Sequence, residues 1–150
     1  EGVSCLAPVY ELAGLERLGL TRHVTSVLPT DEMLPAVAQG AIGVSCRSDD
    51  VKTRDLLQAL NDDRTATAVA CERAFLGKLD GSCRTPIAGL AEIADGLLRF
   101  RGLVLNPEGT EWHEIEKSGA PVDAVSIGAS SGRELLALAG PNFLATLTAR

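Results

Sequence analysis

The dipeptide Asp95-Gly96 constrains the fold more than any other feature, because it separates two apolar runs, residues 87–93 and 97–105. An Asp-Gly pair in this setting is typical of a two-residue β-hairpin, in which both turn positions adopt positive φ. Residues 106–109, Asn-Pro-Glu-Gly, predict a second turn, and residues 112–117 predict a third, more polar strand. We therefore expect a three-stranded antiparallel meander.

One helix is predicted before this meander in the sequence and one after it. Residues 61–79 begin with acidic residues and continue with a broad apolar stripe, and residues 121–139 predict a second helix that Gly140-Pro141 ends. The expected fold class is α+β: a C-terminal domain, residues 62–150, with a three-stranded antiparallel sheet flanked by helices. The candidate core positions of the two helices are Ala66, Val69, Ala70, Phe75, Leu76, Leu79, Ile127, Leu135, Leu136 and Leu138.

Residues 1–61 are organised differently. Three leucines spaced three apart, beginning at Leu12, predict a short helix. The short apolar run at residues 41–46 predicts a buried strand. Ser-Asp-Asp at residues 48–50 can cap a helix that runs to about Leu60. We place a domain boundary between this region and the α+β domain.

Charge and cysteine spacing argue against several classes of protein. The net charge is −6, which argues against a general binder of nucleic acid or of anionic membranes. The four cysteines lie far apart without a Cys-x-x-Cys pair, and the chain has two histidines, so zinc or iron–sulfur ligation is not expected. No apolar run approaches the length of a membrane span. We expect no metal, no nucleic-acid partner and no membrane partner.

A polar loop with one cysteine joins the first long helix to the meander. Residues 79–87 read Leu-Asp-Gly-Ser-Cys-Arg-Thr-Pro-Ile. Cys83 has Arg84 beside it, and a cationic setting favours the thiolate, which is the nucleophilic form. Cys71 lies among small apolar residues and is expected to be a buried hydrophobe. A thiol-dependent hydrolase would also need a matching His and Asn, and no such arrangement supports that alternative.

Three further polar positions have two interpretations each. Arg17 lies off the leucine stripe, where it is either an ordinary surface arginine or faces a cleft. Gln39, in a turn-like Gln-Gly pair, is either a loop-capping amide or a donor to a ligand. Glu72 and its neighbour Arg73 are expected to form a structural charge pair or to be solvated.

Several motifs resemble one known family. They are Leu-Pro-Ala-Val-Ala-Gln-Gly-Ala-Ile-Gly at residues 34–43, Cys-Glu-Arg-Ala-Phe-Leu at residues 71–76, and the loop at residues 79–87. In this order they closely resemble porphobilinogen deaminase, also called hydroxymethylbilane synthase. Gly-Leu-Glu-Arg-Leu-Gly at residues 14–19 fits as well, and the resemblance spans residues 12–143.

The resemblance implies a transferase of tetrapyrrole biosynthesis, the route to haem and chlorophyll. Members of this family condense four molecules of porphobilinogen head to tail, with release of ammonia, to form hydroxymethylbilane. The product grows on a dipyrromethane cofactor held by a thioether, and the cysteine that matches here is Cys83. The resemblance also places Arg17 among the arginines that pair with pyrrole carboxylates, and Gln39 in the cleft near the cofactor.

The resemblance also implies what this chain does not contain. The family chain is longer and has three domains. Residues 1–61 match the end of a two-domain α/β region of the periplasmic-binding-protein kind, and residues 62–150 match the third domain, which anchors the cofactor. The catalytic aspartate belongs to the unmatched part, so no catalytic residue is assigned in this chain, and we expect it to be inactive alone.

The alternative is a non-catalytic relic or scaffold derived from the same family. For the enzyme, we expect a monomer that works with the missing N-terminal domains on the small-molecule substrate porphobilinogen. Several details of the motifs resemble plant and algal members, which favours the plastid stroma, with the cytoplasm as the alternative.

Overall fold

The computed structural model describes residues 9–79 and 86–148. The chain divides into two compact units, Glu1–Met33 and Leu34–Arg150. In the first unit, helix α1 spans Leu12–Arg17 and a 3₁₀ helix, η1, spans Thr21–His23. The prediction of a short helix at Leu12 is therefore confirmed.

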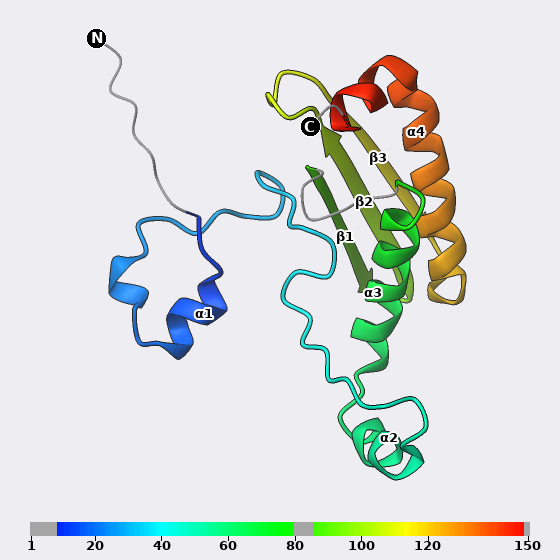
Figure 1. Ribbon diagram of the computed structural model, residues 1–150. Helices are drawn as coiled ribbons and strands as arrows, with labels where there is room; N and C mark the ends of the chain where they lie inside the picture. The colour runs from blue at the N-terminus through cyan, green and yellow to red at the C-terminus, as the bar shows by residue number, and fades with distance from the viewer. Residues whose placement is uncertain (1–8, 80–85, 149–150) are drawn as a thin grey trace. The chain divides into compact units, whose positions relative to one another are not determined.

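The second unit is built on one antiparallel sheet (Figure 1). Its strands are β1 (Ile87–Ala94), β2 (Leu97–Leu105) and β3 (Trp112–Gly119), in the order β1-β2-β3. Asp95 and Gly96 have φ of 52° and 75°, so both turn positions lie in the left-handed region that a two-residue hairpin turn of this type requires. The predicted meander is confirmed.

Two long helices cover one face of this sheet (Figure 1). Helix α3 spans Asp63–Leu76 and packs on β1, while α4 spans Ala124–Thr148 and packs on β3. A 3₁₀ turn, η2 (Pro121–Asp123), leads into α4, whose regular backbone is interrupted at Gly140 with φ of 72°. The predicted α+β fold class is confirmed, and Gly140-Pro141 does interrupt the last helix.

The core lies between the sheet and the two helices. Phe75 of α3 and Phe100 of β2 are fully buried, with ring centroids 4.9 Å apart. Glycines allow the layers to approach: a Cβ on Gly102 would lie 2.7 Å from the Phe75 ring, and one on Gly128 of α4 would lie 2.0 Å from the carbonyl oxygen of Cys71. The α3–α4 interface therefore has no room for a side chain at position 128.

Helix α2, Val51–Gln58, precedes this layered domain. The Asp50 side chain accepts a hydrogen bond from the Thr53 amide, so the predicted cap at residues 48–50 is confirmed. Asp62 caps α3 in the same way by accepting from the Thr65 amide. Among the residues that the structure describes, no helix is long and apolar enough to span a membrane.

Three local predictions were wrong. Residues 41–46 form no strand, because a strand requires a hydrogen-bonded neighbour and nothing in the described sheet pairs with them. Ala66 and Leu138 are exposed instead of buried, because the helical spacing of apolar residues does not by itself show which of them a neighbouring element covers. The predicted α/β character of residues 1–61 and the boundary at residue 61 stay predictions.

Candidate functional site

The loop that carries the predicted anchor joins the end of α3 to the start of β1. Cys83 itself lies outside the described residues. At the end of α3, the chain leaves the helix through Gly77, and the Leu79 amide donates a hydrogen bond of 3.1 Å to the carbonyl oxygen of Leu76. On the far side, the Pro86 carbonyl oxygen accepts a hydrogen bond of 3.0 Å from the Leu105 amide. Both ends of the loop are therefore held by main-chain hydrogen bonds.

A buried carboxylate lies on α3 before this loop. Glu72 is only 5% exposed. Its Oε1 accepts a hydrogen bond of 2.8 Å from the Ala91 amide in β1, and its Oε2 accepts one of 2.6 Å from the Ala38 amide. The prediction that Glu72 is solvated or pairs with Arg73 was wrong, because the carboxylate is buried and, among the described residues, its hydrogen bonds come from main-chain amides.

The environment of Glu72 changes the pKa of its carboxyl group. Burial raises the pKa of the Glu72 carboxyl above its ordinary value, and the hydrogen bonds from Ala91 and Ala38 act in the opposite direction. A sequence signal for this burial exists, since Glu72 is three residues from both Val69 and Phe75 and therefore shares their side of the helix. The amide donors that satisfy the carboxylate could not be read from that spacing.

The Ala38 amide belongs to a turn that contains Gln39. Ala38 has φ of 60° and Gly40 has φ of 83°. The Gln39 amide donates to the Ala36 carbonyl oxygen at 3.0 Å, so Ala38 occupies the third position of a β-turn, where positive φ normally selects Gly or Asn. The Pro35 carbonyl oxygen accepts from the Gly89 amide at 3.0 Å, which attaches the start of this segment to β1.

The predicted cofactor-binding residues are distributed over the chain. Arg17 is exposed in the last turn of α1, in the first unit. Gln39 is exposed at its turn in the second unit, and Cys83 lies outside the described residues. The structure therefore places Gln39 next to the Ala38–Glu72 contact, while the assembly of Arg17, Gln39 and Cys83 into one site stays a prediction.

The described cysteines differ from the setting predicted for Cys83. Cys71 is fully buried, as predicted, and burial together with the neighbouring Glu72 charge raises the pKa of its thiol to about 11. Such a thiol stays protonated at neutral pH and is a poor nucleophile. Cys46 is half-buried and free. Within residues 9–79 and 86–148, no cluster of His, Cys, Asp and Glu has the composition of a metal site.

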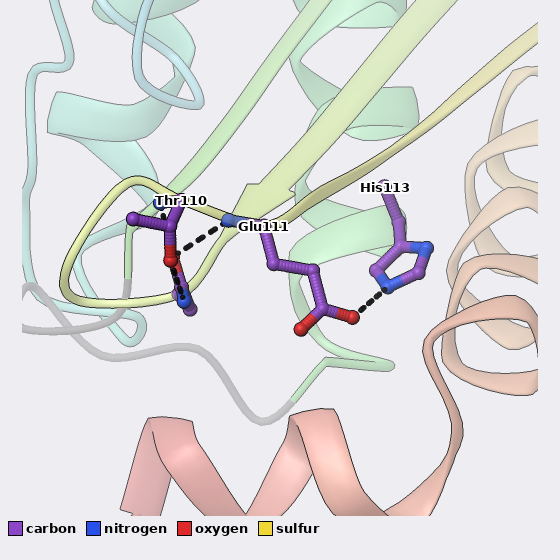
Figure 2. A network of polar contacts seen from close by, with 4 residues as sticks. Thr110, Glu111 and His113 are labelled. Carbon is purple, nitrogen blue, oxygen red and sulfur yellow. Dashed lines mark hydrogen bonds and ion pairs between the residues drawn. The ribbon is translucent and has the colours of Figure 1, made fainter.

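A second group of polar contacts lies at the turn between β2 and β3 (Figure 2). The Asn106 side chain accepts hydrogen bonds from the amides of Thr110 and Glu111, at 2.8 Å and 3.1 Å. His113 lies with Nε2 3.4 Å from Oε1 of Glu111, and its ring packs edge-on against Phe143 with centroids 4.7 Å apart. These contacts close the turn and join it to the end of α4.

The comparison with known proteins agrees with this architecture. Residues 4–55 match a family model described as "Porphobilinogen deaminase, dipyromethane cofactor binding domain". Residues 66–137, which include most of α3, the three strands and much of α4, match the model described as "Porphobilinogen deaminase, C-terminal domain". The fold and these matches define the class: a cofactor-binding segment followed by a C-terminal α+β domain.

Individual relatives give the same result. Over 91% of its own length, the chain is 54% identical to "Porphobilinogen deaminase, chloroplastic" of Pisum sativum. It is 50% identical to the protein of the same name from Oryza sativa subsp. japonica over 94% of its own length. It is 46% identical to "Porphobilinogen deaminase" of Nitrobacter hamburgensis over 91% of its own length. It spans 38%, 40% and 43% of those proteins. The chain belongs to the porphobilinogen deaminase family, as the sequence motifs predicted.

Proposed function

We propose that this chain is the C-terminal portion of a porphobilinogen deaminase, a transferase that condenses four molecules of porphobilinogen into hydroxymethylbilane and releases ammonia. The observation that carries the proposal is the order of the two family matches, with the cofactor-binding segment at residues 4–55 directly before the C-terminal domain at residues 66–137. The reaction belongs to tetrapyrrole biosynthesis, which leads to haem and chlorophyll.

The proposal assigns three residues to the dipyrromethane cofactor. Cys83 forms the thioether, while Arg17 and Gln39 donate hydrogen bonds to the cofactor's carboxylates. When bound, the cofactor supplies the primer on which the tetrapyrrole is built. The donor set fits such a group, because Arg17 and Gln39 are both exposed and offer N–H donors suited to carboxylates.

The contrast between the thiols supports the choice of Cys83. Cys71 is inert because burial raises the pKa of its thiol to about 11. Cys83 has Arg84 beside it and Lys78 five residues away in the sequence, and this cationic neighbourhood favours a thiolate. The thiolate can form a C–S bond to the aminomethyl carbon of a porphobilinogen unit whose C–N bond breaks with release of ammonia. A scaffold without catalytic function has no need of a thiol in a polar loop.

Turnover, in this proposal, requires the N-terminal part that the relatives contain. The chain spans about two fifths of the length of the relatives it matches. We assign no catalytic residue to this chain and expect the isolated chain to form no hydroxymethylbilane. The complete enzyme is proposed to work as a monomer on porphobilinogen, without a nucleic-acid or membrane partner.

The setting that we propose is the plastid stroma. Two of the relatives, from Pisum sativum and Oryza sativa, are named chloroplastic, and they share 54% and 50% identity with the chain. The Nitrobacter relative, at 46% identity, leaves the cytoplasm as the alternative.

The test uses a complete protein made by joining this chain to the N-terminal part of the Pisum relative, here called the joined protein. After incubation with porphobilinogen, intact mass spectrometry and peptide mapping should find two linked pyrrole units on the Cys83 peptide. Cys83→Ser should abolish the adduct, because a hydroxyl is a far weaker nucleophile than a thiolate. Hydroxymethylbilane is measured in the same samples.

Cys46→Ser is the matched control, since Cys46 is a free cysteine that the proposal leaves without a role. The control should keep both the adduct and the activity. An adduct on Cys46 or Cys71 would overturn the assignment of Cys83. A folded joined protein that never acquires an adduct would favour the non-catalytic relic.

A further inference from the structure

The turn before Gln39 adopts a conformation that its sequence does not favour. Ala38 has φ of 60°, in the left-handed region where a Cβ approaches the following carbonyl oxygen. A non-glycine residue persists there when the surrounding contacts determine its conformation. The neighbouring Gly40, with φ of 83°, has no such cost. Some contact must therefore hold Ala38 in place.

The Glu72 carboxylate supplies that contact. Its Oε2 lies 2.6 Å from the Ala38 amide nitrogen, the length of a strong charge-assisted hydrogen bond. Because Glu72 is 5% exposed, water does not compete effectively for this acceptor. Each oxygen of the Glu72 carboxylate accepts a hydrogen bond from a main-chain amide, Ala38 at Oε2 and Ala91 at Oε1.

The same carboxylate connects three segments around the proposed anchor. Glu72 lies on α3, before the loop that contains Cys83, and its Oε1 accepts from Ala91 on β1, after that loop. Its other oxygen holds the turn that presents Gln39. One side chain thus links both flanks of the Cys83 loop to the turn that carries the second proposed cofactor ligand.

We infer that Glu72 is a positioning residue for the cofactor, which fixes the Ala38–Gly40 turn against α3 and β1 so that Gln39 can reach the group anchored at Cys83. The inference rests on the proposed function for the roles of Gln39 and Cys83. Glu72 acts through the main chain at Ala38 and does not itself contact the cofactor.

Glu72→Gln is the informative substitution, because it keeps the size of the side chain and changes its hydrogen bonding. A carboxamide is neutral and offers one oxygen, so the Ala38 amide faces either the NH₂ group or an acceptor without charge, and its hydrogen bond is lost or weakened in both cases. Glu92→Gln is the matched control on β1, where the exposed carboxylate lies 3.6 Å from the Arg101 guanidinium.

The first readout is amide hydrogen exchange of the joined protein, measured by mass spectrometry. In Glu72→Gln, the peptide covering residues 34–41 should exchange severalfold faster, up to about tenfold, the effect of weakening or losing one buried hydrogen bond. A peptide from β2 should be unchanged, as should both peptides in Glu92→Gln. Unchanged exchange at residues 34–41 in Glu72→Gln would overturn the inference.

The second readout is the rate at which the adduct forms on Cys83. Glu72→Gln and Gln39→Ala should lower this rate by similar factors, and the double variant should be no slower than the slower single variant. Effects that multiply would mean that Glu72 acts independently of Gln39, which would overturn the positioning role.

A substitution at Ala38 should restore the rate of adduct formation lost in Glu72→Gln, which would not happen if Glu72 only stabilised the fold. Ala38→Gly should recover much of the rate lost in Glu72→Gln, because glycine adopts positive φ without the Cβ penalty. Ala38→Val, which keeps the Glu72 carboxylate, should reproduce the loss, since a branched side chain opposes positive φ. No rescue by Ala38→Gly, or a normal rate in Ala38→Val, would overturn the inference.

The outcomes separate this inference from the proposed function. An unsubstituted joined protein without an adduct would overturn the proposed function and, with it, the cofactor role of Glu72. A normal adduct on the unsubstituted protein, together with a normal rate in folded Glu72→Gln, would overturn the role of Glu72 alone.

Discussion

The sheet domain, formed by α3, the three strands and α4, and the preceding segment of residues 41–60 both contain apolar residues, but only the sheet domain buries them. Phe100 and Leu135 are 0% exposed, whereas Ile42 is 93% and Leu60 is 74% exposed. The buried apolar side chains of the sheet domain form one cluster with members from α3, the sheet and α4. The comparison shows that an apolar run indicates a segment that can be buried. Whether it is buried depends on a neighbouring element that packs against it.

The largest contrast between the two regions should come from truncating one apolar side chain in each. Phe100→Ala removes a fully buried ring that packs on Phe75, and should lower the free energy of unfolding by about 3 to 5 kcal/mol. Ile42→Ala should change it by no more than about 0.5 kcal/mol. Urea unfolding of the chain measures both, and equal losses would contradict the comparison.

A glycine in each region gives a second, smaller contrast. Gly128→Ala would place a Cβ 2.0 Å from the carbonyl oxygen of Cys71 and so force α3 and α4 apart. We expect a loss of about 3 kcal/mol in the free energy of unfolding, as for an overpacked core. At Gly43, an added Cβ meets nothing within 4 Å, so Gly43→Ala is the matched control. A stable Gly128→Ala protein would show that the helices can separate without cost.

Helix caps give the smallest contrast and add a dependence on pH. Hydrogen bonds from Thr65 lower the pKa of Asp62, the cap of α3, and those from Thr53 lower the pKa of Asp50, the cap of α2. A carboxyl whose pKa is lower in the folded chain stabilises it above the unfolded pKa, near 3.8, and loses this effect as the pH falls through the folded value.

Asp62→Ala should therefore lower the urea midpoint at pH 7, and the difference from the unsubstituted chain should shrink as the pH is lowered past 3.8. Asp50→Ala should leave the midpoint of the sheet domain unchanged, because α2 has no fully buried residue to connect it to that core. A common shift in both variants would mean that α2 and the sheet domain unfold together.

Local chemistry accounts for the features that the sequence predicted correctly. Asp95-Gly96 defines a hairpin because both residues tolerate positive φ, and Gly140-Pro141 interrupts α4 because glycine adopts φ of 72° at that point. The helix at Asp62 begins where a carboxylate can accept from the first turn. Each of these effects operates within a few residues, so the sequence shows it directly.

The family assignment also came from the sequence alone, through the ordered motifs at residues 34–43, 71–76 and 79–87. The proposed site residues came from the same source. Cys83 lies outside the described residues, and the positions of Arg17 and Gln39 are described in separate units. The grouping of these residues into one site is therefore still a prediction from the motifs.

Tertiary structure decided what those patterns left open. The apolar run at residues 41–46 did not become a strand, because strand formation depends on a hydrogen-bonded neighbour. Glu72 became a buried acceptor because folding brings the amides of Ala38 and Ala91, 34 residues before it and 19 after it, to the two oxygens of its carboxylate. The sequence by itself determined the turns and the caps, which depend on residues close together in the chain, and the family, which depends on the order of its motifs. Burial and the partners of Glu72 depend on segments that meet only in the folded protein.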